Sequence, residues 1–82
     1  MPLFLDVHTV PGATITAVAD AHERDLQVQD QYGVKMLKYW VGESTGRISC
    51  LAEAPNKEAV NQVHQEAHGL LATEVLEVTE GS

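Results

Sequence analysis

The sequence is short of the covalent links that stabilise many small proteins. It has one cysteine, Cys50, among 82 residues, so no disulfide can form within the chain. A domain of this size buries a limited core and is marginally stable alone. An efficient core, a bound metal or a partner subunit must therefore replace the missing disulfides. We expect Cys50 itself to be a small buried apolar residue.

Basic residues are also scarce, and long apolar runs are absent. Five Lys and Arg stand against 12 Asp and Glu, which gives a formal net charge of −7. This balance disfavours nucleic acid and anionic membrane surfaces as partners. No run approaches the roughly 18 apolar residues of a membrane span. Residues 1–6 have no basic region and too short an apolar run for a signal peptide, so we expect a cytoplasmic protein.

Four short segments have the alternation of β-strands. In the first, Leu3, Leu5 and Val7 alternate with a mixed set of side chains, and Pro11-Gly12 ends the segment. Residues 42–46 are typical of a longer hairpin turn between two of the strands. The predicted strands are residues 3–10, 34–41, 47–53 and 74–78.

Two segments have helical spacing. The first helix is predicted from a cap at Thr14 or Thr16 to about residue 31, with Gly33 beyond it as a left-handed cap. Its acidic residues, Asp25 among them, are expected to point mostly outward. Its predicted inner stripe is Ile15, Val18, Ala19, His22 and Leu26.

The second helix is predicted from an N-cap at Asn56 to His68, with Gly69 ending it. Its expected inner stripe is Ala59, Val60, Val63 and Ala67, with His64 on the border.

The order strand, helix, strand, strand, helix, strand predicts one α+β domain over residues 1–82 with the ferredoxin-like βαββαβ fold. Right-handed crossovers place both helices on one face of a four-stranded antiparallel sheet. The other face is then uncovered, and a second copy packed against it would give a symmetric homodimer, a dimeric α+β barrel. The residues expected on this uncovered face are Phe4, Met36 and Trp40, with Asp6, His8 and Lys38.

Candidate metal ligands come from the four histidines. His64 and His68 are four residues apart, so both lie on one face of the second helix. Two neutral imidazoles so placed can share a nickel, zinc or copper ion. The pair lacks the Glu directly after the first His that marks zinc proteases. The alternative is that His68 interacts with the helix dipole while His64 only borders the core.

Two further pairs are candidate metal sites. His8 and Asp6 lie two residues apart on one strand face, and the alternative is a hydrogen-bonded pair inside a dimer cavity. His22 has Asp25 about one turn further along the first helix. Because His22 belongs to the inner stripe, a core histidine is favoured there over a metal ligand.

Several sequence segments resemble a known family. They are YGV (32–34), YW (39–40), CLAEAP (50–55), EAV (58–60) and HQEAHGL (64–70), with PLFLD (2–6) and PG (11–12) near the start. In these the chain is similar to small nickel-binding, ferredoxin-like dimers of the nickel-responsive type, a family classed as a domain of unknown function. The resemblance implies a homodimer that binds nickel(II), or zinc or copper in its place, for sequestration or detoxification.

Two other functions are compatible with the predicted fold. Dimeric α+β barrels of this build include small monooxygenases and isomerases, in which Asp6, His8 or Glu53 would act as acid or base in a cavity beside the sheet. This interpretation depends on fold analogy alone. The third possibility is a module that only binds a small molecule or another protein. Since no nucleophile and base occur at a recognisable spacing, we expect nickel binding rather than catalysis.

Overall fold

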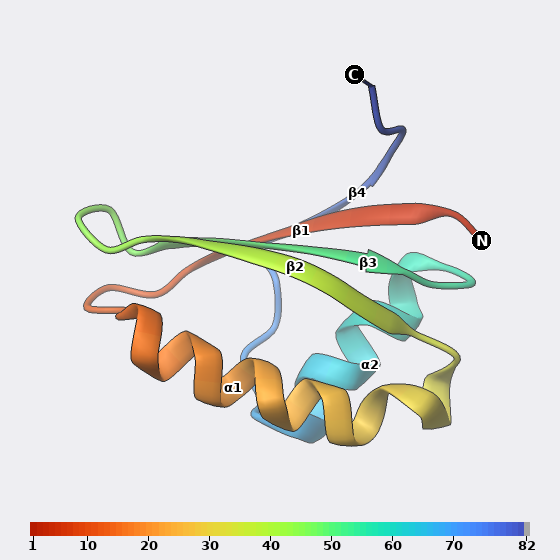
Figure 1. Cartoon of the computed structure of the whole chain (residues 1–82), viewed down its shortest axis with the longest axis horizontal. Helices are drawn as coiled ribbons and strands as arrows, with labels where there is room; N and C mark the ends of the chain where they lie inside the picture. Colours follow the sequence, from red (N-terminus) through yellow and green to blue (C-terminus); the bar gives the residue numbers. More distant parts are fainter. Residues whose placement is uncertain (82) are drawn as a thin grey trace.

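The computed structural model describes residues 1–81 and has a four-stranded antiparallel sheet in the order β2-β3-β1-β4. Both helices lie against the same face, and the other face is bare (Figure 1). The predicted ferredoxin-like βαββαβ fold is confirmed. The elements are β1 Leu3–Thr9, α1 Ile15–Val28, the 3₁₀ helix η1 Gln29–Tyr32, β2 Lys35–Gly42, β3 Arg47–Glu53, α2 Lys57–Ala67 and β4 Glu74–Val78.

Polar caps fix where each helix begins. The Thr14 side chain accepts a hydrogen bond from the Ala17 amide at 3.2 Å, and the Asn56 side chain accepts one from the Ala59 amide at 2.9 Å. Each bond satisfies an amide that has no partner within its helix. Neither helix in residues 1–81 is long and apolar enough to cross a membrane.

The core lies between the sheet and the two helices. Its larger part is at the end of the sheet near α2, and a smaller part lies under α1. Along β1, Asp6 lies between Phe4, which belongs to the larger part, and His8. The cross-strand partner of His8 is Ile48, which belongs to the smaller part. The larger part consists of Phe4, Val34, Met36, Ala52, Ala54, Ala59, Val60 and Val63, and the smaller of Ala13, Val18, Ile48 and Cys50.

The predicted set of residues on the uncovered face was wrong for β1. Phe4, Asp6 and His8 are 6%, 0% and 4% exposed, so the mixed face of β1 is turned toward the helices. The apolar face, with Leu3, Leu5 and Val7, is the uncovered one. Either orientation of β1 is compatible with the alternation. The polar side chains can be buried against the helices because they hydrogen-bond to one another.

In β2 an irregularity divides the predicted set. The register shifts between Met36 and Lys38, which is the signature of a β-bulge. As a result Met36 is buried under the helices, while Lys38 and Trp40 face outward as expected. Alternation without the bulge places all three on one face, which is why Met36 was assigned to the wrong side.

The uncovered face is therefore more apolar than expected. Leu5 of β1 lies opposite Leu51 of β3 and Leu76 of β4, and cross-strand partners share a face. The row continues to Lys38 of β2, the partner of Leu51, and Trp40, which is 52% exposed, lies in the neighbouring row opposite Ser49. The face presents contiguous leucines across three strands, with charged residues such as Lys38 around them.

Substituting Asn56 tests how strongly α2, the helix that carries two of the histidines, depends on its cap. Asn56→Ala removes the bond to the Ala59 amide, and we expect it to lower the free energy of unfolding by about 1 kcal/mol. Urea denaturation measures this change. Asn56→Asp keeps an acceptor at the same place and should retain most of the stability, so an equal loss in both variants would contradict the role of the cap.

Candidate metal centre

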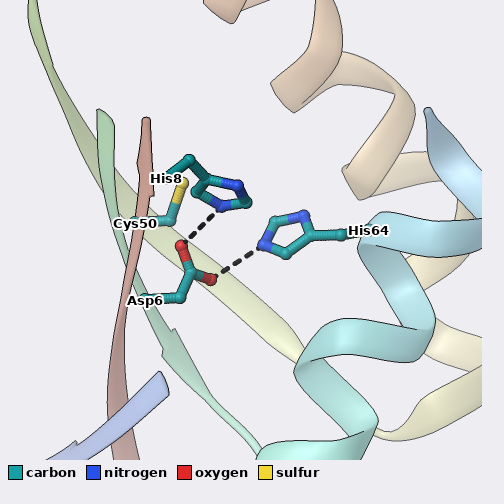
Figure 2. A group of neighbouring side chains, drawn as sticks. All are labelled: Asp6, His8, Cys50 and His64. Atoms are coloured by element: carbon teal, nitrogen blue, oxygen red, sulfur yellow. Dashed lines mark hydrogen bonds and ion pairs between the residues drawn. The ribbon is translucent and has the colours of Figure 1, made fainter. Parts of the chain in front are cut away.

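Asp6 is at the centre of a buried cluster on the helix-facing side of the sheet. Its Oδ1 accepts a hydrogen bond from Nε2 of His8 at 2.9 Å, and its Oδ2 accepts one from Nε2 of His64 at 2.8 Å. Figure 2 shows both rings directed at this carboxylate, with Cys50 beside it. All four residues are buried, so water does not compete for these bonds.

Strand register and helical spacing together build this cluster. Asp6 and His8 are two residues apart on β1, so they share one face, and Cys50 of β3 is the cross-strand partner of Asp6. His64 enters from α2 at the position one turn after Val60. Because Val60 and Val63 are fully buried against the sheet, the same face of α2 directs His64 toward Asp6.

A second buried carboxylate, Asp25 of α1, extends the cluster. Its Oδ1 accepts a hydrogen bond from Nδ1 of His64 at 3.1 Å, and Nε2 of His68 lies 3.1 Å from the same oxygen. Asp25 is 3% exposed, so its expected outward position was wrong. Helix α1 is rotated so that Ile15 and Leu26, both assigned to its inner stripe, are 52% and 36% exposed.

His64 is doubly protonated in this arrangement, because each of its ring nitrogens faces a carboxylate oxygen. Burial alone would lower its pKa. The hydrogen bonds to Asp25 and Asp6, with the charge of both carboxylates, outweigh burial and raise the pKa of His64 to about 9. The ring is thus a buried imidazolium that ties both helices to the sheet.

The two carboxylates are ionised for the matching reason. Burial would raise the pKa of Asp6, but the hydrogen bonds from His64 and His8 and the nearby positive charge lower it to about 2. Burial likewise opposes ionisation of Asp25, and the bonds from His64 and His68 outweigh it and lower its pKa. Burial, together with the charge of Asp6, raises the pKa of the Cys50 thiol, which is therefore protonated in the metal-free protein.

The outer histidines are held in defined tautomers. The Leu70 amide donates a hydrogen bond to Nδ1 of His68 at 3.1 Å, so the proton of that ring is on Nε2, facing Asp25. Gly69, with a φ of 78°, lets the chain turn back for this contact. His8 donates through Nε2 to Asp6, and its Nδ1 has no hydrogen-bond partner within residues 1–81.

These side chains form two groups with the spacing of metal ligands. One consists of Asp6, His8, Cys50 and His64, and the other of Asp25, His64 and His68; in each, the donor atoms lie within 4.8 Å of one another. Imidazole nitrogen, carboxylate oxygen and thiolate sulfur together suit nickel, zinc or copper better than magnesium or calcium. An ion in the first group would take the place of the proton on Nε2 of His64.

Most of the predicted site residues converge, in a way that the sequence did not show. Two separate candidate pairs, His8 with Asp6 and His64 with His68, meet in one cluster, and Asp25 joins them. His22 is in neither group; its ring packs on Tyr39 with centroids 4.7 Å apart. Cys50 was missed, and the antiparallel pairing of β1 with β3 was the signal that could have placed it opposite Asp6.

The imidazolium between two carboxylates makes stability depend on pH. In metal-free protein, we expect the free energy of unfolding to fall as the pH rises from 6.5 to about 9, because the folded protein keeps the His64 proton that the unfolded chain loses. Below pH 6.5 this contribution is complete. The free energy of unfolding falls again as the pH drops from 3.8 toward about 2, because Asp6 of the folded protein then takes up a proton that the unfolded chain already carries. Both changes report one interaction, whose size is on the order of 3 kcal/mol.

Urea denaturation at a series of pH values, with a chelator present, measures this dependence. His64→Gln should abolish the decline between pH 6.5 and 9, and His22→Gln, which changes a histidine outside the cluster, should keep it. The Cys50 thiol has an ordinary pKa of 9.0 that burial raises in the folded protein, so its contribution falls mainly above this window and is present in both variants. An unchanged decline in the His64→Gln variant would show that the imidazolium is not its source.

Comparison with known proteins identifies the family to which the chain is similar. A family model described as "Nickel responsive protein SCO4226-like" matches residues 4–78. Among solved structures, the chain is similar to that in the crystal structure of SCO4226 from Streptomyces coelicolor A3(2). The two share 37% sequence identity and superpose with a TM-score of 0.90, over 98% of this chain and 99% of that chain. No curated protein matches the chain.

Proposed function

The chain belongs to the SCO4226-like nickel responsive protein family, and from this premise we propose that it binds nickel(II) through the buried histidine–aspartate cluster. One observation carries the proposal: the donor atoms of Asp6, His8, Cys50 and His64 already lie within 4.8 Å of one another. The ligands come from two strands and a helix that packing holds in place, so little reorganisation is needed to surround an ion.

The charge of the cluster favours a divalent cation. Asp6 and Asp25 are ionised, and the imidazolium of His64 compensates only one of these charges. A metal ion that displaces the proton between Asp6 and His64 would restore the balance inside the protein, where uncompensated charge is costly. Binding must release at least this proton, so affinity should increase with pH.

Burial of the ligands supports sequestration or detoxification as the role of binding. His8 and His64 are 4% and 1% exposed, and an ion held by them would be shielded from solvent and from competing ligands. Such a site favours retention of the ion over rapid exchange. Zinc and copper(II) accept the same donors, and in the general order of affinities copper exceeds nickel, so selectivity would depend on geometry.

We further propose that the protein is a homodimer joined through the uncovered face of the sheet. Leu5, Leu51 and Leu76 form an apolar row there, and Trp40 and Leu76 are 52% and 46% exposed. A two-fold axis through this face would pair each row with its own copy, since a symmetric interface uses the same patch on both subunits. With a net charge of −7 on each chain, the apolar centre must outweigh mutual repulsion.

Nickel titration of the variant His8→Gln tests the proposed site. Gln preserves a hydrogen-bond donor to Asp6 but not the imidazole nitrogen, so we expect the loss of at least one nickel equivalent per chain, or a tenfold or greater loss in affinity. Isothermal titration calorimetry on chelator-treated protein measures both quantities, and circular dichroism checks the fold. The matched control, His22→Gln, alters a histidine outside both ligand groups and should titrate as the wild type does. Equal nickel binding by the two variants would refute the assignment.

The dimer is tested by placing a charge at the centre of the uncovered face. Light scattering should give twice the 8.9 kDa chain mass for the wild type and the single chain mass for Leu5→Lys. Ile15→Lys is the control, because Ile15 is a 52% exposed apolar residue on the helical layer instead. A monomeric wild type, or a Leu5→Lys variant that stays dimeric, would contradict this interface.

A further inference from the structure

A cavity of about 100 Å³ lies between α1 and the sheet, beside the cluster. At its inner end it is lined by His8, Cys50 and His64, three of the four residues proposed to hold nickel. Figure 2 shows these three side chains in the space between the sheet and the helices. Among the other lining residues, Ala17 and Leu70 are exposed, so the cavity meets solvent between them. It therefore connects solvent with the buried donor atoms.

The proposed ligands have almost no direct contact with solvent. The four residues of the group that contains Asp6 are at most 8% exposed. Two other hollows, one beside Tyr32 and one beside Pro55, contain no residue of either ligand group. A buried metal site needs an entry path. An ion must therefore pass through the cavity or enter when the helical layer opens.

Polar groups along the cavity can replace water around a cation. Oδ1 of Asp25 makes both contacts with the histidines, and Oδ2 has no hydrogen-bond partner within residues 1–81. Every fully buried side-chain oxygen in these residues has a partner, so Oδ2 borders open space, and Asp25 lines this cavity. His22, Tyr39 and His68 also line it. A carboxylate oxygen in a narrow cavity attracts cations and repels anions.

We propose that this cavity is the path by which a divalent metal ion reaches and leaves the buried donors while the helices stay packed on the sheet. The inference rests on the proposed function, because the ion must bind at the cluster. At roughly 30 Å³ for each water molecule the cavity holds about three, so an ion can pass with part of its hydration shell. The width of the path sets the barrier but not the free energies of the bound and free states. A change at the exposed end should therefore alter the association and dissociation rates by the same factor.

Two variants change the exposed end of the cavity in opposite directions. Ala17→Leu narrows it and Leu70→Ala widens it. Stopped-flow mixing of chelator-treated protein with nickel and a coloured nickel indicator gives the association rate, and release of bound nickel to excess EDTA gives the dissociation rate. We expect both rate constants to fall about tenfold in Ala17→Leu and both to rise in Leu70→Ala. The dissociation constant from isothermal titration calorimetry should stay that of the wild type in each.

Matched controls lie next to both positions. Ala19→Leu adds the same atoms at a half-buried alanine outside the lining, and Leu71→Ala truncates an exposed leucine outside it, so both should exchange nickel as the wild type does. Entry by opening of the helices would instead give faster exchange in the less stable Asn56→Ala and no change in Ala17→Leu. That result, or a change in only one of the two rate constants of Ala17→Leu, would overturn the path but leave the nickel site standing. No nickel binding by the wild type would refute the site and the path together.

Discussion

The structure depends on one buried interaction, the imidazolium of His64 held between the carboxylates of Asp6 and Asp25. The three residues come from α2, β1 and α1, so this contact joins both helices to the sheet. Each member is costly to bury alone, and removal of one leaves an uncompensated charge in the core. The hydrogen bonds satisfy the buried ring and one oxygen of Asp25 while fixing the distance between the helical layer and the sheet.

The same arrangement explains how a site with the character of a metal centre exists in a core this small. Apolar residues at both ends of the sheet, from Phe4 to Ile48, enclose the cluster and exclude water. In that setting, the imidazolium of His64 and a divalent ion would be alternative partners for the same carboxylate oxygens. The folded metal-free state is thereby stabilised by a proton at the position proposed for the ion, and metal binding there would release this proton.

The sequence predicted the elements well and the faces of β1 and α1 less well. Helix caps at Thr14 and Asn56, the glycine after η1 and the alternation in β1 all correspond to local preferences, and each lies where it was expected. Alternation in β1 predicted that two faces differ but not which one meets the helices. The apolar face was expected to meet the helices, yet it is the uncovered one. The polar face can be buried because Asp6 accepts a hydrogen bond from His64.

Contacts between distant segments explain why the site was predicted only in part. His64 and His68 were recognisable as a pair from helical spacing, and His8 with Asp6 from strand spacing. Nothing local shows that Asp25, 39 residues before His64, completes the bridge, or that Cys50 faces Asp6. The bulge in β2 is also a tertiary feature, since it brings Met36 and Tyr39 to the same face of a strand whose simple alternation separates them.

The most direct test of this account is a crystal of the protein soaked in nickel and measured at the nickel absorption edge. We predict an anomalous peak within bonding distance of Nε2 of His8 and Nε2 of His64, with Asp6 as a third ligand and its hydrogen bonds to the two rings replaced by metal bonds. Nickel found only on surface side chains, with the hydrogen bonds of Asp6 intact, would contradict the account.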